Sequence, residues 1–270
     1  MNNIGKNYLD IRYMDTLASG DTPLHRLDPR AKLITTLLFI VAVVSFDKYT
    51  LLAFVPFFIY PMVLISAGGL PAGYFLKKVL QVSPFAVLVG IFNPIMDREI
   101  IYHIGSIGIS GGWISFLSIL LRFFLTVSAA LILIALTGFN AVCQALTKLG
   151  VPRVFVVQLL FFYRYIFVLV DEAERMETAR SLRSFNSRSM RFRTFISIIG
   201  HLLLRSLDRA EHIYLAMRCR GFDGHIRLIR TIKAGWKDLA FVAGWSLLFV
   251  VFRMNNIPMR LGEIVMEVFK

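Results

Sequence analysis

The chain has 270 residues, of which 57% are hydrophobic and 17% are charged. A soluble globular protein has about 45–50% apolar and about 25% charged residues, so this composition argues against a water-soluble enzyme. The apolar residues come in long blocks, and two cysteines, Cys143 and Cys219, imply no disulfide framework. The net charge is nevertheless +13, from 30 Lys and Arg against 17 Asp and Glu. These features predict an integral membrane protein with a basic region outside the lipid.

The N-terminal segment, residues 1–30, carries four aspartates and no long apolar stretch, so it is expected to be cytoplasmic or interfacial and not a cleaved leader. A helix needs about 20 apolar residues to cross the hydrocarbon core of a bilayer. Five stretches are expected to do so: 31–46, 49–76, 79–96, 112–136 and 236–252. The Gly-Gly-Leu-Pro sequence at 68–71 should end the second span, and a loop with Lys77 and Lys78 should precede the third.

Residues 155–170 are mostly apolar but contain Gln158 and Arg164. An arginine at the centre of a membrane helix costs about 2.5–3.5 kcal/mol on insertion scales. The stretch also continues without a helix breaker into the charged residues 171–175. It is therefore interpreted as part of one long helix that lies under or along the bilayer, and not as a sixth span.

Lysines and arginines gather in the cytoplasmic loops of membrane proteins. The segments before and between the first four spans hold five, one, two and one of them in turn. This alternation puts the N-terminus in the cytoplasm and returns the chain there after four spans within residues 31–137. Residues 138–235 are then a cytoplasmic region, residues 236–253 form the fifth span, and residues 254–270 form a C-terminal tail.

Two long amphipathic helices are predicted in the cytoplasmic region, because apolar residues recur there at alternating spacings of three and four. The first apolar seam is formed by Phe155, Leu159, Phe162, Ile166, Leu169, Ala173 and Met176. The second is formed by Leu203, Leu207, Ala210, Tyr214 and Met217. Periodicity alone indicates only that the two helices pack along each other as a small core.

Both of these helices end with an arginine between two small residues. The first end is Ala179-Arg180-Ser181 and the second is Cys219-Arg220-Gly221, with Arg183, Arg218 and Phe222 as supporting residues. Small neighbours leave the guanidinium accessible, and arginine presents a rigid fork of donors to carboxylates and helix C-termini. Gly221 is also expected to cap its helix. Two such ends predict a docking site for an acidic soluble partner.

Nucleic acid and anionic lipid are the alternative partners of the basic region. Nucleic-acid-binding modules present aromatic platforms or a known fold among their basic residues. The sequence shows neither, so no nucleic acid is expected. Contact with the lipid bilayer is expected for some of Arg188, Arg191 and Arg193, which cluster between the two helices. Lipid contact leaves the paired helix ends unexplained.

The two helix ends resemble the paired Ala-Arg-Gly signatures of the transmembrane (T) component of energy-coupling factor (ECF) transporters, a class of ABC importer. The similarity is closest to the cobalt and nickel branch, the CbiQ type. Ser181 stands for the family's Gly and Cys219 for its Ala, and both substitutions keep the residue small. Further matching motifs run along the chain: Leu27-Asp28-Pro29-Arg30-Ala31-Lys32, Pro84-Phe85, Phe92-Asn93-Pro94, Gly111-Gly112-Trp113, Leu149-Gly150-Val151-Pro152, Tyr163-Arg164-Tyr165 and Arg205-Ser206-Leu207-Asp208-Arg209-Ala210.

The resemblance implies an all-α polytopic protein of the bacterial inner membrane, with about five transmembrane helices and a cytoplasmic region of long amphipathic coupling helices. The coupling helices would sit in grooves of two ABC ATPase subunits (CbiO-like), which bind ATP and Mg²⁺. The remaining surface would hold a substrate-binding membrane subunit (CbiM-like) and a small accessory membrane subunit (CbiN-like). The implied function is that of the non-catalytic coupling subunit of an importer for cobalt or nickel.

The chain itself is not expected to catalyse a reaction or to bind a metal or cofactor. Gly68 and Gly73 have P-loop spacing, but the Lys and the Ser or Thr that should follow are missing. The five histidines are scattered, without metal-ligand spacing. Arg122, the one clearly ionisable residue within a span, is interpreted as a structural arginine. The alternative function, a stand-alone membrane scaffold or secondary carrier with a basic cytoplasmic regulatory region, stays open at this point.

Overall fold

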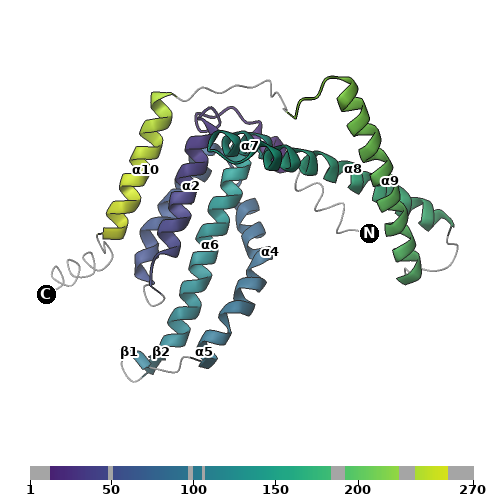
Figure 1. The fold of residues 1–270 in the computed structure, drawn as a ribbon. Helices are drawn as coiled ribbons and strands as arrows, with labels where there is room; N and C mark the ends of the chain where they lie inside the picture. Colours follow the sequence, from purple (N-terminus) through teal and green to yellow (C-terminus); the bar gives the residue numbers. More distant parts are fainter. Residues whose placement is uncertain are drawn as a thin grey trace. The chain divides into compact units, whose positions relative to one another are not determined.

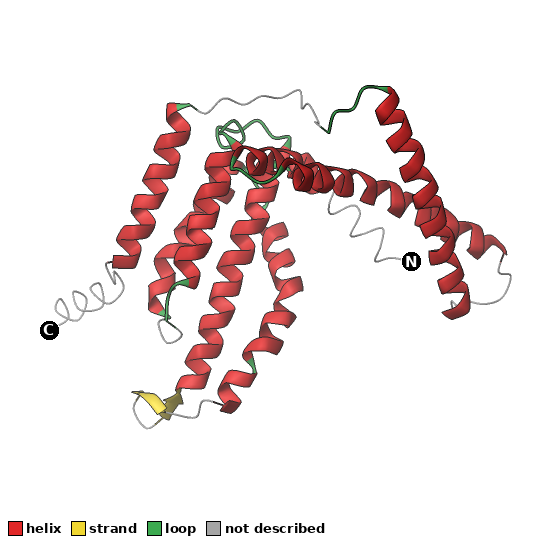
Figure 2. Ribbon diagram, viewed as in Figure 1, coloured by secondary structure: helices red, strands yellow, loops and turns green. Residues whose placement is uncertain are grey.

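The computed structural model describes residues 13–47, 51–96, 100–104, 107–183, 192–224 and 235–254. The chain divides into two compact units. The bundle unit comprises Met14–Val142 and Ile232–Lys270, and the basic unit comprises Met1–Tyr13 and Cys143–Thr231. Helices make up most of the described part of both units (Figure 2). The predicted all-α fold class is therefore confirmed.

The bundle unit is organised around the long helix α6 (Figure 1). Its elements in chain order are α2 (Pro29–Val44), the 3-10 helix η1 (Leu52–Phe58), α3 (Ile59–Gly68), α4 (Ala72–Gly90), α5 (Phe92–Met96), β1 (Ile100–Ile104), β2 (Ile107–Ser110), α6 (Gly111–Thr137) and α10 (Trp236–Met254). Helix α6 packs against both α2 and α4, and α10 packs against α2. Strands β1 and β2 pair as a short antiparallel hairpin, in addition to the predicted helices.

Three of the predicted spans coincide with single helices. Helices α2, α6 and α10 match the stretches 31–46, 112–136 and 236–252 to within two residues at each end. Helix α2 begins at Pro29, where the fixed φ of proline suits the first turn, and the carboxylate of Asp28 accepts a hydrogen bond from the Arg30 amide at 2.8 Å. Capping chemistry and apolar length therefore act together at this helix start.

The second and third predicted spans need correction. The second is η1 followed by α3, and it ends as predicted at the Gly-Gly-Leu-Pro turn, where Gly69 adopts a left-handed conformation with φ +63°. Helix α4 then begins at Ala72, not at residue 79. Lys77 and Lys78 therefore lie inside the helix, and the loop predicted around them is wrong. Lysine is a good helix former, so these charges do not interrupt the helix.

By length and composition, three helices of the described chain are able to cross a membrane: Ala72–Pro94, Gly111–Thr137 and Arg153–Arg183. Ala53–Gly68 is a shorter apolar helix. The third of the long helices contains the stretch 155–170 and is continuous, as predicted. Its length and composition permit a crossing, and its predicted course along the bilayer stays a prediction.

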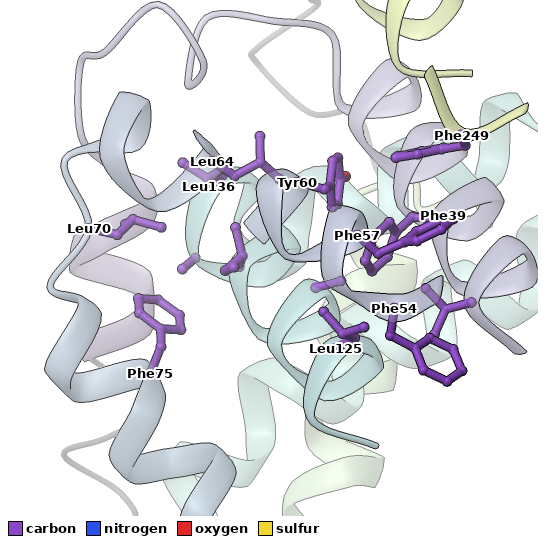
Figure 3. Packing of buried hydrophobic residues seen from close by; sticks show 14 of the residues in the cluster. Phe39, Phe54, Phe57, Tyr60, Leu64, Leu70, Phe75, Leu125, Leu136 and Phe249 are labelled. Atoms are coloured by element: carbon purple, nitrogen blue, oxygen red, sulfur yellow. The ribbon is translucent and has the colours of Figure 1, made fainter. Parts of the chain in front are cut away.

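Aromatic side chains hold α2, η1, α3 and α10 together in the core of the bundle unit (Figure 3). The ring of Phe39 lies 4.5 Å from that of Tyr60 and 5.4 Å from that of Phe249, measured between centroids. From η1, the ring of Phe57 contacts those of Phe39 and Phe249, with centroids 6.0 Å and 6.2 Å away. Such pairs contribute about 0.5–1.5 kcal/mol each beyond the burial of their area, so this cluster fixes the packing of four elements.

Charged side chains bind the helix termini of the bundle unit. The carboxylate of Asp238 accepts one hydrogen bond from the Gly235 amide at the start of α10 and a second from the Asp28 amide at the start of α2, each at 2.7 Å. Lys32 donates from Nζ to the carbonyl of Leu136 at 2.9 Å, near the end of α6. A negative charge near a helix N-terminus and a positive charge near a helix C-terminus interact favourably with the backbone dipoles. These contacts therefore join the ends of three helices.

The other end of α2 is bound by two arginines. Arg122 of α6 donates from Nη2 to the carbonyls of Phe46 at 2.8 Å and Asp47 at 2.7 Å. Arg253 of α10 donates to the carbonyl of Ser45 at 2.9 Å. The guanidinium of Arg122 thus satisfies backbone carbonyls that follow a helix. Its contacts are structural, in agreement with the interpretation from the sequence.

The basic unit is made mainly of two long helices, α8 (Arg153–Arg183) and α9 (Phe192–Cys219). The shorter α7 (Phe139–Lys148) precedes them and includes the boundary between the two units. The predicted cytoplasmic region, residues 138–235, contains most of the basic unit. The position of this region relative to the membrane stays a prediction. The same holds for the positions of the segments 1–30 and 254–270.

Candidate functional site

Helices α8 and α9 form an antiparallel crossed pair (Figure 1). Glu172 of α8 contacts Arg205 of α9, and Phe161, earlier in α8, has its ring 6.5 Å from that of Phe222, just after α9. Later residues of α9 therefore meet earlier residues of α8. Two long helices that meet in this way place their C-terminal ends at opposite ends of the pair.

The predicted apolar seams are only partly correct. In α8, Ile166, Ala173 and Met176 are half-buried, but Phe155 and Phe162 are exposed. In α9, the less exposed residues are Thr194, Ile198, Leu202, Ser206, Ile213 and Met217. Leu203, Leu207 and Tyr214 of the predicted seam are instead more than half exposed. The face of α9 toward α8 is thus rotated from the predicted seam, because α9 carries apolar residues on both faces.

The first arginine-bearing end lies beside a groove of about 680 Å³ between α8 and α9. The groove is lined by Glu172, Arg175, Met176, Ala179, Arg180, Arg183, Ile198, His201 and Arg205. Arg180 is half-buried, and its Nε is shielded from solvent without a hydrogen-bond partner among the described residues. Ala179 and Ser181 on either side are exposed. The small neighbours are exposed, while the guanidinium of Arg180 is partly shielded, and its accessibility to a partner stays a prediction.

The second end closes α9 with a left-handed glycine. Gly221 has φ +74°, its amide donates to the carbonyl of Arg218 at 3.0 Å, and the amide of Phe222 donates to the carbonyl of Met217 at 3.0 Å. This pair of hydrogen bonds is the Schellman motif, so the predicted C-cap at Gly221 is confirmed. Cys219 and Arg220 are exposed. Arg218 lies over the ring of Tyr214, 5.9 Å from its centroid.

The structure does not bring the two ends together. Arg180 lies eight residues beyond Glu172 along α8, a distance of about 12 Å in a helix. Arg220 lies fifteen residues beyond Arg205 along α9, or about 22 Å. We call the part of α8 from Glu172 to Arg180, and the part of α9 from Arg205 to Arg220, the two arms. Because the helices are antiparallel, the two arms extend from the crossing in opposite directions along the pair. The two arginine-bearing ends are therefore separate features of the helix pair.

The electrostatic character of the first groove comes from four arginines, of which Arg175 has no role predicted from the sequence. Arg175 and Arg205 line it together with Arg180 and Arg183, against the single carboxylate of Glu172. Four guanidinium groups around one groove favour an anionic ligand. A signal for Arg175 was present in the sequence, because Arg175, Ala179 and Arg183 follow each other at intervals of four and share one helix face.

Comparison with known proteins agrees with the resemblance stated from the motifs. The family CbiQ, cobalt transport protein, matches residues 20–232. An uncharacterized protein of Methanocaldococcus jannaschii is 31% identical over 230 residues, which are 81% of this chain and 78% of that protein. Energy-coupling factor transporter transmembrane protein EcfT of Thermosediminibacter oceani is 27% identical over 248 residues, covering 86% of this chain and 92% of that protein. EcfT of Bacillus subtilis is 25% identical over 260 residues, covering 89% and 96%.

The family match extends over most of the chain and includes both arginine-bearing helix ends. The similar transmembrane proteins are matched over nearly their whole length. Together with the apolar helices of the bundle unit, these matches make the chain a multi-pass membrane subunit of a transporter. The chain belongs to the CbiQ family of cobalt transport proteins and is an energy-coupling factor transporter transmembrane component.

Proposed function

We propose that this chain is the non-catalytic coupling subunit of an ECF-type importer for a transition-metal ion, cobalt or nickel, in the bacterial inner membrane. Two ABC ATPase subunits bind ATP and Mg²⁺ and drive the motion. A separate membrane subunit binds the metal. The observation that carries the proposal is the position of Arg180 and Arg220 on opposite arms of one crossed helix pair, since two separate docking points suit two separate ATPase subunits.

Each docking point has the chemistry for an acidic partner. Arg180 presents its guanidinium beside a groove that contains three further arginines. Arg220 is exposed on a helix end that the Schellman motif of Gly221 holds in one conformation. Arginine binds carboxylates and helix C-termini through a planar fork of donors. Docking of an acidic groove at each point would couple the crossed pair to the motion of both ATPases.

An apolar face of α9 supports docking of a second membrane protein. This apolar face consists of Phe192, Ile196, Ile199, Leu203, Leu207 and Tyr214, all at least 47% exposed. These residues recur at spacings of three and four, apart from one longer step, so they share one side of the helix. Contiguous apolar surface of this kind marks an interaction site. We assign it to the substrate-binding membrane subunit.

The metal is assigned to that partner and not to this chain. Within the described part of the chain, no three His, Cys, Asp or Glu side chains are grouped in a way that would hold a metal ion. A transition-metal site requires several such ligands from N, O or S donors. In the proposed assembly this chain passes motion to the metal-binding subunit and makes no direct contact with the ion.

The proposal is tested by retention of the ATPase on tagged variants of the chain, together with metal uptake in cells. Removing one member of a buried, hydrogen-bonded charge pair at an interface costs about 2–5 kcal/mol, so Arg180→Ala and Arg220→Ala should each weaken ATPase retention at least tenfold. Arg→Lys at either position should restore little, because the ammonium keeps the charge but loses the fork.

The matched control is Arg209→Ala, which removes an exposed arginine from the middle of α9. It should leave ATPase retention and metal uptake close to those of the unmodified chain. If Arg180→Ala and Arg220→Ala both behave like Arg209→Ala, the two motifs are solvated helix ends and the coupling assignment fails.

A further inference from the structure

An ion pair joins α8 to α9 at their crossing. The guanidinium of Arg205 donates from Nη1 to Oε1 of Glu172. The side chain of Glu172 is only 14% exposed, and that of Arg205 is 66% exposed. Arg205 begins the motif 205–210, which the proposed function leaves without a role. The mostly shielded carboxylate of Glu172 and the guanidinium of Arg205 therefore make a specific contact between α8 and α9.

The packing around this ion pair is thin. In the described structure, α9 has no buried residue and α8 has one, Val156. Open grooves of about 680 Å³ and 540 Å³ flank the crossing, and both Glu172 and Arg205 line each of them. Apolar burial therefore contributes little to the angle at which the helices cross. The ion pair lies where the helices meet and where the two grooves begin.

We infer that the Glu172–Arg205 pair is the pivot that fixes the angle between the two arginine-bearing arms. The inference rests on the proposed function for the meaning of the arms, and it names two positioning residues for that function. Arg220 lies about 22 Å from the crossing along α9, so a rotation of about 20° about the pivot would displace it by about 8 Å. Two docking points that engage two subunits at once need a fixed separation.

Glu172→Gln removes a charge at nearly constant side-chain size, and Arg205→Gln removes the opposite charge together with the end of the side chain. Glu172→Gln and Arg205→Gln should each widen the range of crossing angles, and the exchange Glu172→Arg with Arg205→Glu should narrow it again. Matched controls are Glu174→Gln on α8 and Arg193→Gln on α9, both exposed and neither in the lining of the two grooves. The controls should leave the crossing unchanged.

The crossing is measured by pulsed electron paramagnetic resonance on the full chain in lipid nanodiscs. Spin labels are attached at Thr178→Cys and Leu215→Cys, which are exposed on the two arms, after Cys143→Ser and Cys219→Ser remove the native thiols. The expected result is a broad distance distribution for both Gln variants and a narrow one for the unmodified pair, the exchanged pair and the controls. Equal distributions for the Gln variants and the controls would overturn the inference, and so would a failure of the exchange to narrow the distribution.

ATPase retention on the same variants separates the pivot from the proposed function, since the distance measurement needs no ATPase. The Arg205 side of the pair is exposed to solvent, and an ion pair in contact with solvent contributes up to about 1 kcal/mol. Each Gln variant should therefore weaken ATPase retention by up to about fivefold, and the exchange should recover it. If the unmodified chain retains no ATPase, the proposed function fails while the distance result stands. If the Gln variants retain ATPase but match the controls in distance, the pivot fails alone.

Discussion

Replacement of Asp238 by alanine tests how the bundle unit is held together. The Asp238 side chain is buried and accepts two hydrogen bonds, from the amides of Gly235 and Asp28, at 2.7 Å each. A hydrogen bond to a charged group contributes about 1.5–3 kcal/mol, and its loss leaves the buried donor unpaired. Asp238→Ala should therefore lower the free energy of unfolding by about 3–6 kcal/mol.

The assay is thermal unfolding of the purified chain in detergent. A change of 1 kcal/mol shifts the Tm of a chain of this size by about 2–4 °C, so Asp238→Ala should lower the Tm by at least about 6 °C. Asp238→Asn keeps one acceptor oxygen and should lose about half as much. The control is Lys237→Ala, at the exposed neighbouring position. A Tm for Asp238→Ala equal to that of the control would refute the view that the hydrogen bonds of Asp238 hold α2 and α10 together.

Three further outcomes are expected. Gly90→Ala should destabilise the chain by about 1–3 kcal/mol, because the added Cβ would lie 2.8 Å from Cδ2 of Phe116. In the same helix, the Cβ added by Gly73→Ala meets nothing within 4 Å, so this variant should be neutral or stabilising in the same Tm assay. Burial lowers the pKa of His25, so the folded state favours the neutral imidazole. The Tm should therefore fall as the pH drops below about 6.5, the pKa of histidine in the unfolded chain. His25→Gln should reduce this pH dependence of the Tm. The purified chain alone should bind Co²⁺ or Ni²⁺ only weakly in calorimetry, and a stoichiometric sub-micromolar site would contradict the assignment of the metal to a partner.

Long apolar stretches and local caps are what could be predicted from the sequence. The helices at 112–136 and 236–252 follow from long and mostly apolar stretches, and the cap at Gly221 follows from one residue that tolerates positive φ. The start of α4 differs from the predicted one because the backbone turn at Gly69 and Pro71 sets it, and Lys77 and Lys78 continue the helix without a break.

Contacts between distant residues could not be predicted in the same way. Glu172 and Arg205 are 33 residues apart, and neither carries a local signal that identifies its partner. Helix α9 has apolar residues on two faces, so periodicity alone does not decide which face meets α8. The hydrogen bond from the Asp28 amide to Asp238 joins two helix starts 210 residues apart. Such contacts depend on the tertiary arrangement, which the periodicity of a single sequence does not encode.

The most direct test of the account is site-specific photocross-linking in the assembled transporter. A photoreactive residue is placed at Ser181 beside Arg180, at Cys219 beside Arg220, and, as a control, at Glu211 on the exposed middle of α9. The account predicts that both Ser181 and Cys219 become covalently joined to an ATPase subunit and that Glu211 does so much less. Cross-linking at Ser181 and Cys219 no stronger than at Glu211 would contradict the claim that the two arginine-bearing ends are the docking points.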